Sequence, residues 1–341
     1  MDSVGSAIID FTEAAYDLEV SDEEWLPTLL NRGLPVFEHG LGVAGMRYGR
    51  PPDGGSFQLL DVHVASGPKD FAERHTRALA TTPSEVLREQ VRPGRASTAS
   101  ADADANDGQI AHYISHVDYC KDLLYLTAVD CKGAGVAIVA PLPKVTSLTG
   151  HAAERWQMIA AHVDAGHRLR QALSDHAAGE EPCPDLPYDA EAIFDGNSLR
   201  LTEAVGQAKE RGSTSKLREA AITVDRARGK MRSTDPDKAL KTWKALVRGR
   251  WSMVDWFDTD GRRFVLALPN SPGVADPRGL SERESQVVTY AVLGQTNKLI
   301  AYRLGLSTSR VSMLLRGAMQ KLGVQTRTQL VLKMRNFDRL D

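Results

Sequence analysis

A polar face without acidic residues follows one side of the segment 306–324, which reads LSTSRVSMLLRGAMQKLGV. Successive residues of an α-helix lie about 100° apart, so the spacing assigns each residue to a face. The polar face carries hydroxyl, amide and guanidinium groups, which form hydrogen bonds and attract a negatively charged partner. It comprises Ser309, Ser312, Met313, Arg316 and Gln320, with Arg310 and Lys321 at its flanks.

The opposite face of this segment is apolar, and the spacing predicts that it is buried. Leu314, Leu315, Ala318 and Leu322 lie within about 60° of Val311, with Met319 at the edge. Ser307 stands at the N-cap position, where its hydroxyl can accept from unpaired backbone amides, and Gly323 ends the helix. Taken alone, the pattern is typical of an ordinary amphipathic helix packed on a domain.

A shorter helix is predicted just before it, in the stretch QTNKLIAYRLG at 295–305. Thr296 or Asn297 can serve as its N-cap, and Gly305 stands where the chain must turn. A short helix, a glycine-containing turn and a capped second helix form the helix-turn-helix arrangement.

Two more helices complete the predicted module. In LSERESQVVTYAVLG at 280–294, Ser281 and Glu284 have the spacing of a capping box, and Gly294 ends the helix. A fourth helix begins near Thr326. The sequence therefore predicts a compact bundle of four short helices.

The segment from Leu280 to Met334 resembles the LuxR-type helix-turn-helix domain, without a gap in order or spacing. The matching positions are Leu280, Arg283, Glu284, Gly294, Asn297, Lys298, Ile300, Ala301, Leu304, Ser307, Val311, Leu315, Lys321, Leu322, Gly323, Val324 and Arg327. The resemblance implies binding to double-stranded DNA, with Ser312, Met313 and Arg316 facing the major groove. The full set of expected DNA contacts is Ser309, Arg310, Ser312, Met313, Arg316, Gln320, Lys321 and Lys298.

Two departures from the family pattern bear on base preference. Ser312 replaces the usual Lys, which removes one cation near the DNA, and Leu314 replaces the usual His. Arg310 could supply the missing charge from the flank of the face. The base preference of the family therefore does not transfer to this chain.

The distribution of charge supports a nucleic-acid partner. From Arg278 to the end there are 11 Lys plus Arg against 4 Asp plus Glu, a net +7, whereas the whole chain carries −2. The remaining residues therefore sum to −9. A basic module on an acidic body is expected where one end of a chain binds a phosphate backbone, although a basic solvated surface gives the same count.

The opposite charges also suggest a regulatory hypothesis. In one state the acidic sensor could cover Arg310, Arg316 and Lys321, and a ligand or partner would shift the population toward an open form. Exposed opposite charges are screened beyond roughly 8 to 10 Å, so such docking would be weak and sensitive to salt.

Helix-turn-helix modules usually bind DNA as dimers, so a homodimer is expected. Leu330, Val331 and Met334 on the fourth helix are the predicted dimer contacts, and the long helix before Leu173 is a second candidate seam. The alternative is that the three residues of the fourth helix only complete the core of their own module.

Length and composition indicate a globular protein of two or three domains. The chain has 341 residues, of which 42% are hydrophobic and 25% charged. No signal peptide is recognised, and no apolar stretch approaches the roughly 18 residues of a membrane span. Three scattered cysteines, Cys120, Cys131 and Cys183, suit neither a disulfide framework nor a zinc site. A cytoplasmic protein is expected.

Two linkers divide the chain into three parts, and a third loose tract lies inside the first part. Segments 176–189 and 270–279 are rich in residues that prevent regular structure and are predicted linkers, and 92–108 is predicted to be a mobile surface loop. The fold class is α+β, with three expected domains: 1–175, 188–269 and a DNA-binding domain at 279–336.

The first part, 1–175, alternates helical and extended patterns. Its clearest feature is a hairpin of two apolar runs, 122–130 and 136–143, followed by a long helix from about Gly150 to Leu173. A sheet with helices on one face, ending in a hairpin and a long output helix, is similar to GAF-type sensor domains.

The second part, 188–269, resembles a small PAS-like fold. It has a short strand at 190–196, helices at 215–232 and 236–247, and a final hairpin. Asp258, Thr259, Asp260 and Gly261 form the turn of that hairpin, because Asp-Gly tolerates the positive backbone angles required there.

Sites for other chemistry are sparse in the sequence. His112 and His116 could share one helical face as metal ligands, but the alternation of QIAHYISHVDYC favours a strand with structural or surface histidines. There is no phosphate-binding loop, no dinucleotide fingerprint and no acidic cluster of a phosphoryl-accepting receiver. Neither an enzyme, a metal site nor a cofactor is expected.

The sequence thus predicts a one-component transcriptional regulator with GAF-like and PAS-like sensor modules, responding to a small-molecule or protein signal. Two alternatives stay open. A protein-interaction adaptor could retain the helical bundle without reading DNA, as the missing Lys at Ser312 would allow. A metal or redox sensor could use the histidines with Cys120 or Cys131.

Overall fold

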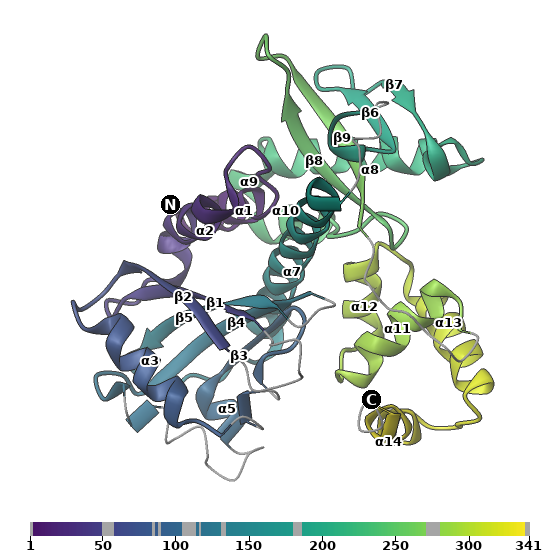
Figure 1. Ribbon diagram of the computed structural model, residues 1–341. Helices are drawn as coiled ribbons and strands as arrows, with labels where there is room; N and C mark the ends of the chain where they lie inside the picture. Colours follow the sequence, from purple (N-terminus) through teal and green to yellow (C-terminus); the bar gives the residue numbers. More distant parts are fainter. Residues whose placement is uncertain are drawn as a thin grey trace.

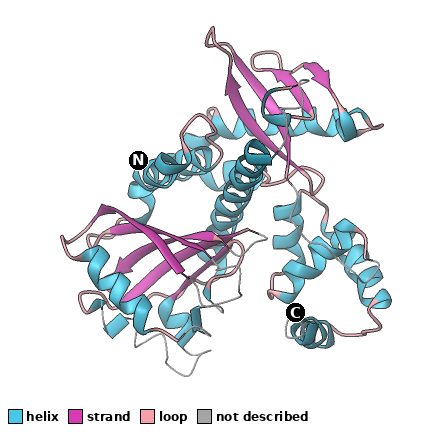
Figure 2. Cartoon of the chain, in the orientation of Figure 1, coloured by secondary structure: helices cyan, strands magenta, loops and turns pink. Residues whose placement is uncertain are grey.

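The computed structural model describes residues 3–49, 58–83, 86–87, 90–103, 114–115, 117–130, 134–179, 186–270 and 280–337. Two antiparallel sheets, a long central helix and a C-terminal helical module make up this part of the chain (Figures 1 and 2). The α+β class is confirmed.

The first sheet has five antiparallel strands in the order β2-β1-β5-β4-β3. They are β1 Val43–Gly49, β2 Gln58–Ser66, β3 Arg95–Thr98, β4 Asp122–Val129 and β5 Gly135–Leu142. The predicted hairpin is confirmed, since β4 pairs with β5 from Asp122↔Leu142 to Val129↔Gly135.

Helices cover both faces of this sheet, whereas the sequence predicted only one covered face. They are α1 Ser3–Ala15, α2 Asp22–Phe37, α3 Phe71–Thr81, α5 Ala99–Ala103 and α7 Gly150–Gly179. In β4, Leu124 and Leu126 join the core under α1, α2 and α7, while Leu123 and Tyr125 join a second core with α3. Both faces of β4 are therefore buried, which explains its nearly continuous apolar sequence.

The second sheet has four antiparallel strands in the order β7-β6-β9-β8. They are β6 Ala192–Asp195, β7 Leu201–Ala204, β8 Trp251–Phe257 and β9 Arg263–Pro269. The predicted final hairpin is present, with Gly261 at φ +74° in its turn. Short 3-10 helices lie at Pro187–Asp189 and Gly206–Lys209.

Three helices accompany the second sheet: α8 Ser213–Arg228, α9 Met231–Thr234 and α10 Pro236–Thr242. The helix predicted at 236–247 ends five residues early because the backbone becomes extended at Trp243, whose side chain is fully buried. The segment after Thr242 therefore leaves the helix, and its residues pack into both the core of the body and the core of the C-terminal helices.

One contiguous hydrophobic core joins the two sheets, so residues 3–270 form a single packed body in the part of the chain described. Its axis is α7, in which every residue from 158 to 170 is buried. The proposed second dimer seam along this helix is therefore not available in this structure, because its middle is already covered within one chain.

Two local predictions were wrong. The tract 92–108 was predicted to be a loop, but it contains strand β3 and helix α5, and its residues 104–108 lie outside the described residues. The stretch around the two histidines was predicted to be a strand, yet residues 114, 115 and 117 are helical. His112 and His116 themselves lie outside the described residues.

The C-terminal module has four helices: α11 Glu282–Val292, α12 Asn297–Leu304, α13 Thr308–Lys321 and α14 Arg327–Phe337. They enclose a core of their own, to which the body contributes Leu246. In Figure 1 the module lies beside α7, with α12 next to that helix. Among the described residues, no helix is long and apolar enough to cross a membrane.

Candidate DNA-binding interface and its attachment to the body

Local hydrogen bonds begin each of the first three helices of the module. The capping box of α11 is formed, with Ser281 Oγ accepting from Glu284 N and the Glu284 carboxylate accepting from Ser281 N at 2.8 Å. Thr296 caps α12 and Ser307 caps α13. The three predicted caps are confirmed. The sequence could predict them because each cap depends on residues only three positions apart.

The turn between α12 and α13 depends on Gly305. Its φ is +61°, which an L side chain rarely adopts, and a Cβ at this position would overlap the carbonyl oxygen of Leu246. The glycine therefore sets the helix-turn-helix angle and also allows the turn to approach the body closely.

Helix α13 has the two faces that the sequence predicted. Val311, Leu314, Leu315, Ala318 and Leu322 are buried in the module core. Ser309, Arg310, Met313, Arg316 and Gln320 are exposed. Met313 is 52% exposed, which is unusual for a large apolar residue on a surface that only meets water. Its position fits a contact with a partner.

Two of the predicted DNA contacts are engaged inside the module. Ser312 is half-buried; its hydroxyl accepts from Asn297 Nδ2 at 3.1 Å and donates to the Thr308 carbonyl. Lys321 Nζ lies 2.6 Å from a Glu284 carboxylate oxygen. This hydrogen bond is the main cause that lowers the pKa of Glu284. Ser312 and Lys321 thus brace the helix-turn-helix as well as lying near its outer face.

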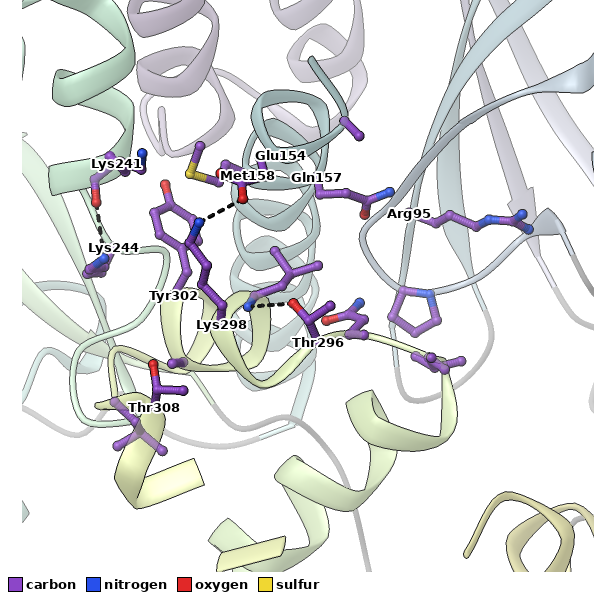
Figure 3. Close-up of a pocket in the computed structure, with 18 of the residues that line it drawn as sticks. Arg95, Glu154, Gln157, Met158, Lys241, Lys244, Thr296, Lys298, Tyr302 and Thr308 are labelled. Carbon is purple, nitrogen blue, oxygen red and sulfur yellow. Dashed lines mark hydrogen bonds and ion pairs between the residues drawn. The ribbon is translucent and has the colours of Figure 1, made fainter. Parts of the chain in front are cut away.

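Lys298 extends from α12 toward the body, apart from the exposed face of α13. Its ammonium group lies 2.7 Å from Glu154 on α7 (Figure 3). Because both side chains are about half exposed or more, at 65% and 46%, this ion pair contributes roughly 0 to 1 kcal/mol. A partner that competes for Lys298 therefore meets little resistance from this contact.

Arg303 of α12 makes a far more buried contact. Its guanidinium donates to Asp164 on α7 at 2.8 Å and to the Gly94 carbonyl at 2.7 Å, and it lies 4.6 Å from the centre of the Tyr290 ring. The side chains of Arg303 and Asp164 are 1% and 0% exposed. Asp164 also lies 3.1 Å from Arg168, so one carboxylate serves two guanidinium groups.

Gly94 accommodates this contact. Its φ is +51°, and a Cβ at this position would overlap the guanidinium of Arg303. The body therefore holds α12 partly through a backbone carbonyl that only glycine can place so close.

A second buried contact runs from Tyr302 through His162 to Tyr16, the residue that follows α1. His162 Nε2 lies 2.7 Å from the Tyr302 hydroxyl, and His162 Nδ1 lies 2.9 Å from the Tyr16 hydroxyl. The Tyr302 hydroxyl donates to the Leu240 carbonyl at 2.6 Å, so it can accept from a protonated Nε2. Burial lowers the pKa of His162 to about 3, which keeps the imidazole neutral.

These attachments were missed at the sequence level. Tyr302, Arg303, His162, Asp164 and Gly94 come from segments up to 209 residues apart. On α12 the local signal was two polar residues, Tyr302 and Arg303, in a short helix, which is equally typical of a solvated surface. The predicted covering of Arg310, Arg316 and Lys321 by the body is not observed. All three are exposed, and the body contacts α12 instead.

The predicted dimer contacts on α14 divide into buried and partly buried positions. Leu330 has no exposed surface and lies in the module core, while Met334 packs against that core from a half-buried position. Val331 is half-buried, and the neighbouring Leu332 is 57% exposed. The accessible apolar surface of α14 therefore centres on Val331 and Leu332.

The residues that could take part in metal or redox chemistry are the histidines and the cysteines Cys120, Cys131 and Cys183. Among the described residues, no group of three or more His, Cys, Asp or Glu is placed to hold a metal ion. Cys120 is buried, and burial raises the pKa of its thiol to about 11, which disfavours the reactive thiolate. Cys131 and Cys183 lie outside the described residues.

The capped helices, the glycine turn and the exposed polar face of α13 define the C-terminal module as a helix-turn-helix domain. Comparison with protein families gives the same result: the GerE model, described as bacterial regulatory proteins of the luxR family, matches residues 278–334. This segment is therefore a LuxR-family domain, and a domain of this family supports a role in transcriptional regulation. No curated protein matches the chain.

Proposed function

We propose that the protein is a one-component transcriptional regulator, without catalytic activity, that binds specific double-stranded DNA in the cytoplasm. The observation that carries this proposal is the exposed polar face of α13, free of acidic residues, on a helix whose other face is buried in a LuxR-family module. In a helix-turn-helix domain the second helix enters the major groove and the first crosses the backbone.

The exposed side chains suit the groups found in a major groove. A guanidinium such as that of Arg316 can hold the two acceptors of a guanine edge, and an apolar side chain such as Met313 can contact a thymine methyl group. Arg310 and Lys298 would bind phosphates, which position the module without specifying sequence. Ser309 and Gln320 extend the same exposed face.

The body is proposed to be the sensor. A five-stranded antiparallel sheet, ending in a hairpin and followed by the long helix α7, supports a GAF-like module, and the four-stranded sheet with its final hairpin supports a PAS-like module. Because α7 contacts α12 directly, a small-molecule or protein signal that shifts α7 would change how α12 is held.

The active form is proposed to be a homodimer on two half-sites. The exposed Leu332 beside Val331 on α14 is the apolar surface that supports this assembly. The half-sites would lie about one helical turn, 10 to 10.5 base pairs, apart.

A duplex-DNA titration of the full chain against salt tests the proposal. Sites mapped across the genome supply the specific duplex, and a scrambled duplex is the matched control. A regulator shows tighter binding to the specific duplex, with an affinity that falls linearly with salt on logarithmic axes. An adaptor that retains only the helical bundle would bind neither duplex at low salt, and that result would contradict the proposal.

A further inference from the structure

A cavity of about 820 Å³ lies between the body and the module (Figure 3). One wall comes from α7 and the segment before β3, and another from the end of α10. The third wall comes from α12 and the turns at each end of it. This volume lies within the range of about 300 to 1,000 Å³ typical of pockets for small molecules.

The chemistry of the cavity is cationic around an apolar lining. Basic residues line it from both sides: Arg92, Lys241 and Lys244 from the body and Lys298 from the module. Arg95 also borders the cavity, but its guanidinium points away from it and pairs with Asp102 at 2.5 Å (Figure 3). Apolar residues between them include Met158, Leu293, Leu299 and Leu306. Glu154 is the single acid among the described lining residues, and it is already paired with Lys298.

Lys241 and Lys244 lie close together at one edge of the cavity. Lys244 Nζ donates to the Lys241 carbonyl at 3.0 Å and lies 4.6 Å from the centre of the Tyr302 ring. The pKa of Lys244 is lowered because its ammonium group is partly desolvated and because the charge of Lys241 is close. An anion placed between the two ammonium groups would relieve this repulsion.

We propose that this cavity binds a small organic anion, with an apolar body and at least one carboxylate or phosphate group, that bridges Lys241 and Lys244 of the body to Lys298 of the module. The apolar lining accepts the body of the ligand, and the lysines hold its charge. Lys298 can join the ligand because its contact with Glu154 is exposed and weak.

Binding at this place has a regulatory consequence, which rests on the proposed DNA-binding function. The three walls enclose the cavity only while α12 is docked, so the ligand favours the docked arrangement. DNA binding also requires Lys298, so the ligand weakens DNA binding. By reciprocity, DNA weakens the binding of the ligand by the same factor.

The first test measures binding in the absence of DNA, so its outcome does not depend on the proposed function. The probe is 8-anilinonaphthalene-1-sulfonate, an apolar two-ring anion, titrated into the full chain by fluorescence and calorimetry. The parent is expected to bind about one probe per chain. The double variant Lys241→Glu/Lys244→Glu should bind about tenfold more weakly or worse, because two charge-assisted contacts are reversed.

Two matched variants make the test specific. Lys230→Glu/Lys238→Glu changes the same charge at exposed positions near α10 that do not line the cavity, and it should bind the probe as the parent does. Ala153→Phe places a ring in the cavity from a half-buried position on α7 and should block the probe without a charge change. The proposal is overturned if the parent shows no saturable binding, or if the cavity variants bind like the parent.

DNA itself is the competing polyanion, and a second titration separates it from a small ligand. If Lys241 and Lys244 hold a small anion, their double variant binds duplex DNA as tightly as the Lys230→Glu/Lys238→Glu variant. Weaker DNA binding by the cavity variant, relative to that control, would mean that the cavity holds the phosphate backbone, and it would overturn the proposal.

Discussion

The two helices of the helix-turn-helix are presented in opposite ways. On α12, Arg303 is fully buried against the body and Tyr302 nearly so, whereas on α13 Arg310, Met313 and Arg316 are exposed. The body therefore does not hide the surface expected to read bases; it holds the helix expected to cross the backbone. We propose that docking of α12 against the body restrains DNA binding, because it fixes the position of this helix and engages Lys298.

The contacts that hold α12 also differ from one another. The Lys298–Glu154 pair is exposed and screened, so it can exchange readily with another partner. The Arg303–Asp164 pair is almost fully buried, so losing one partner strands a charge in the interior. The first contact is suited to exchange and the second to fixing the geometry.

The largest effect on stability is expected from the buried Arg303–Asp164 pair. Asp164→Ala leaves the guanidinium groups of Arg303 and Arg168 without their shared carboxylate, and it should lower the free energy of unfolding by about 3 to 5 kcal/mol. Urea unfolding followed by circular dichroism measures it. Glu154→Ala, which removes the exposed acid on the same helix, is the control and should cost less than about 1 kcal/mol. Equal effects of the two variants would remove the distinction.

The exposed face of α13 gives the next effect. Arg316→Ala should weaken binding to the specific duplex by about 1 to 3 kcal/mol, because a bidentate contact to guanine is lost, and should leave unfolding unchanged. Fluorescence anisotropy measures the affinity. Arg226→Ala, at an exposed position on α8, is the matched control. Val311→Asp should instead unfold the module, since Val311 is fully buried. Unchanged affinity in Arg316→Ala would show that the reading face is assigned wrongly.

Acid should weaken the attachment of α12 through His162. Its pKa is about 3 in the folded chain and about 6.5 when unfolded, so the unfolded chain binds the extra proton between these values. The stability due to the neutral imidazole is complete above about pH 6.5 and is lost as the pH falls. His162→Gln should reduce the slope of unfolding free energy by up to about 1.4 kcal/mol per pH unit.

Urea titrations from pH 7 to pH 4 measure this slope. His75→Gln is a useful comparison. Burial also lowers the pKa of His75 to about 3, but His75 belongs to α3 and its ring stacks on Phe71, outside the contacts that hold α12. Both substitutions should flatten the pH profile, yet only His162→Gln should change the pH dependence of DNA binding. An identical profile for His162→Gln and the parent would contradict the assigned neutral, buried state.

The smallest effect is expected at the exposed ion pair. Glu154→Gln frees Lys298 without removing it, so DNA affinity should rise by less than about 1 kcal/mol. The gain should vanish when Glu154→Gln is combined with Lys298→Met. A double-mutant cycle of these two substitutions isolates the interaction between Glu154 and Lys298. If Glu154→Gln raised DNA affinity equally in the parent and in the Lys298→Met variant, the gain would come from the loss of a negative charge and not from freeing Lys298.

The module was predictable because its signals are local. Ser281, Thr296 and Ser307 cap helices three residues ahead, and Val311 and Leu315 recur at the helical period. The hairpins were predictable for the same reason, from apolar runs around Asp-Gly or a glycine loop. Both predictions required no knowledge of distant residues.

The attachment of the module could not be predicted in this way. Asp164 and Arg303 are 139 residues apart, and each by itself is typical of a solvated helical face. The charge totals indicated attraction between body and module, but charge alone selects the most exposed cations, such as Arg310 and Arg316. The structure shows that the buried contact forms instead where a glycine carbonyl, a carboxylate and an aromatic ring surround one guanidinium.

The affinity of the full chain for its specific duplex in Gly94→Ala, compared with the parent at one salt concentration, tests the central claim most directly. Gly94 belongs to the body, so every residue of the module stays unchanged, while a Cβ there disturbs the contact of Arg303. If docking of α12 restrains DNA binding, the variant binds more tightly than the parent. Equal or weaker binding by a folded variant, with the module's helices intact by hydrogen exchange, would contradict the account.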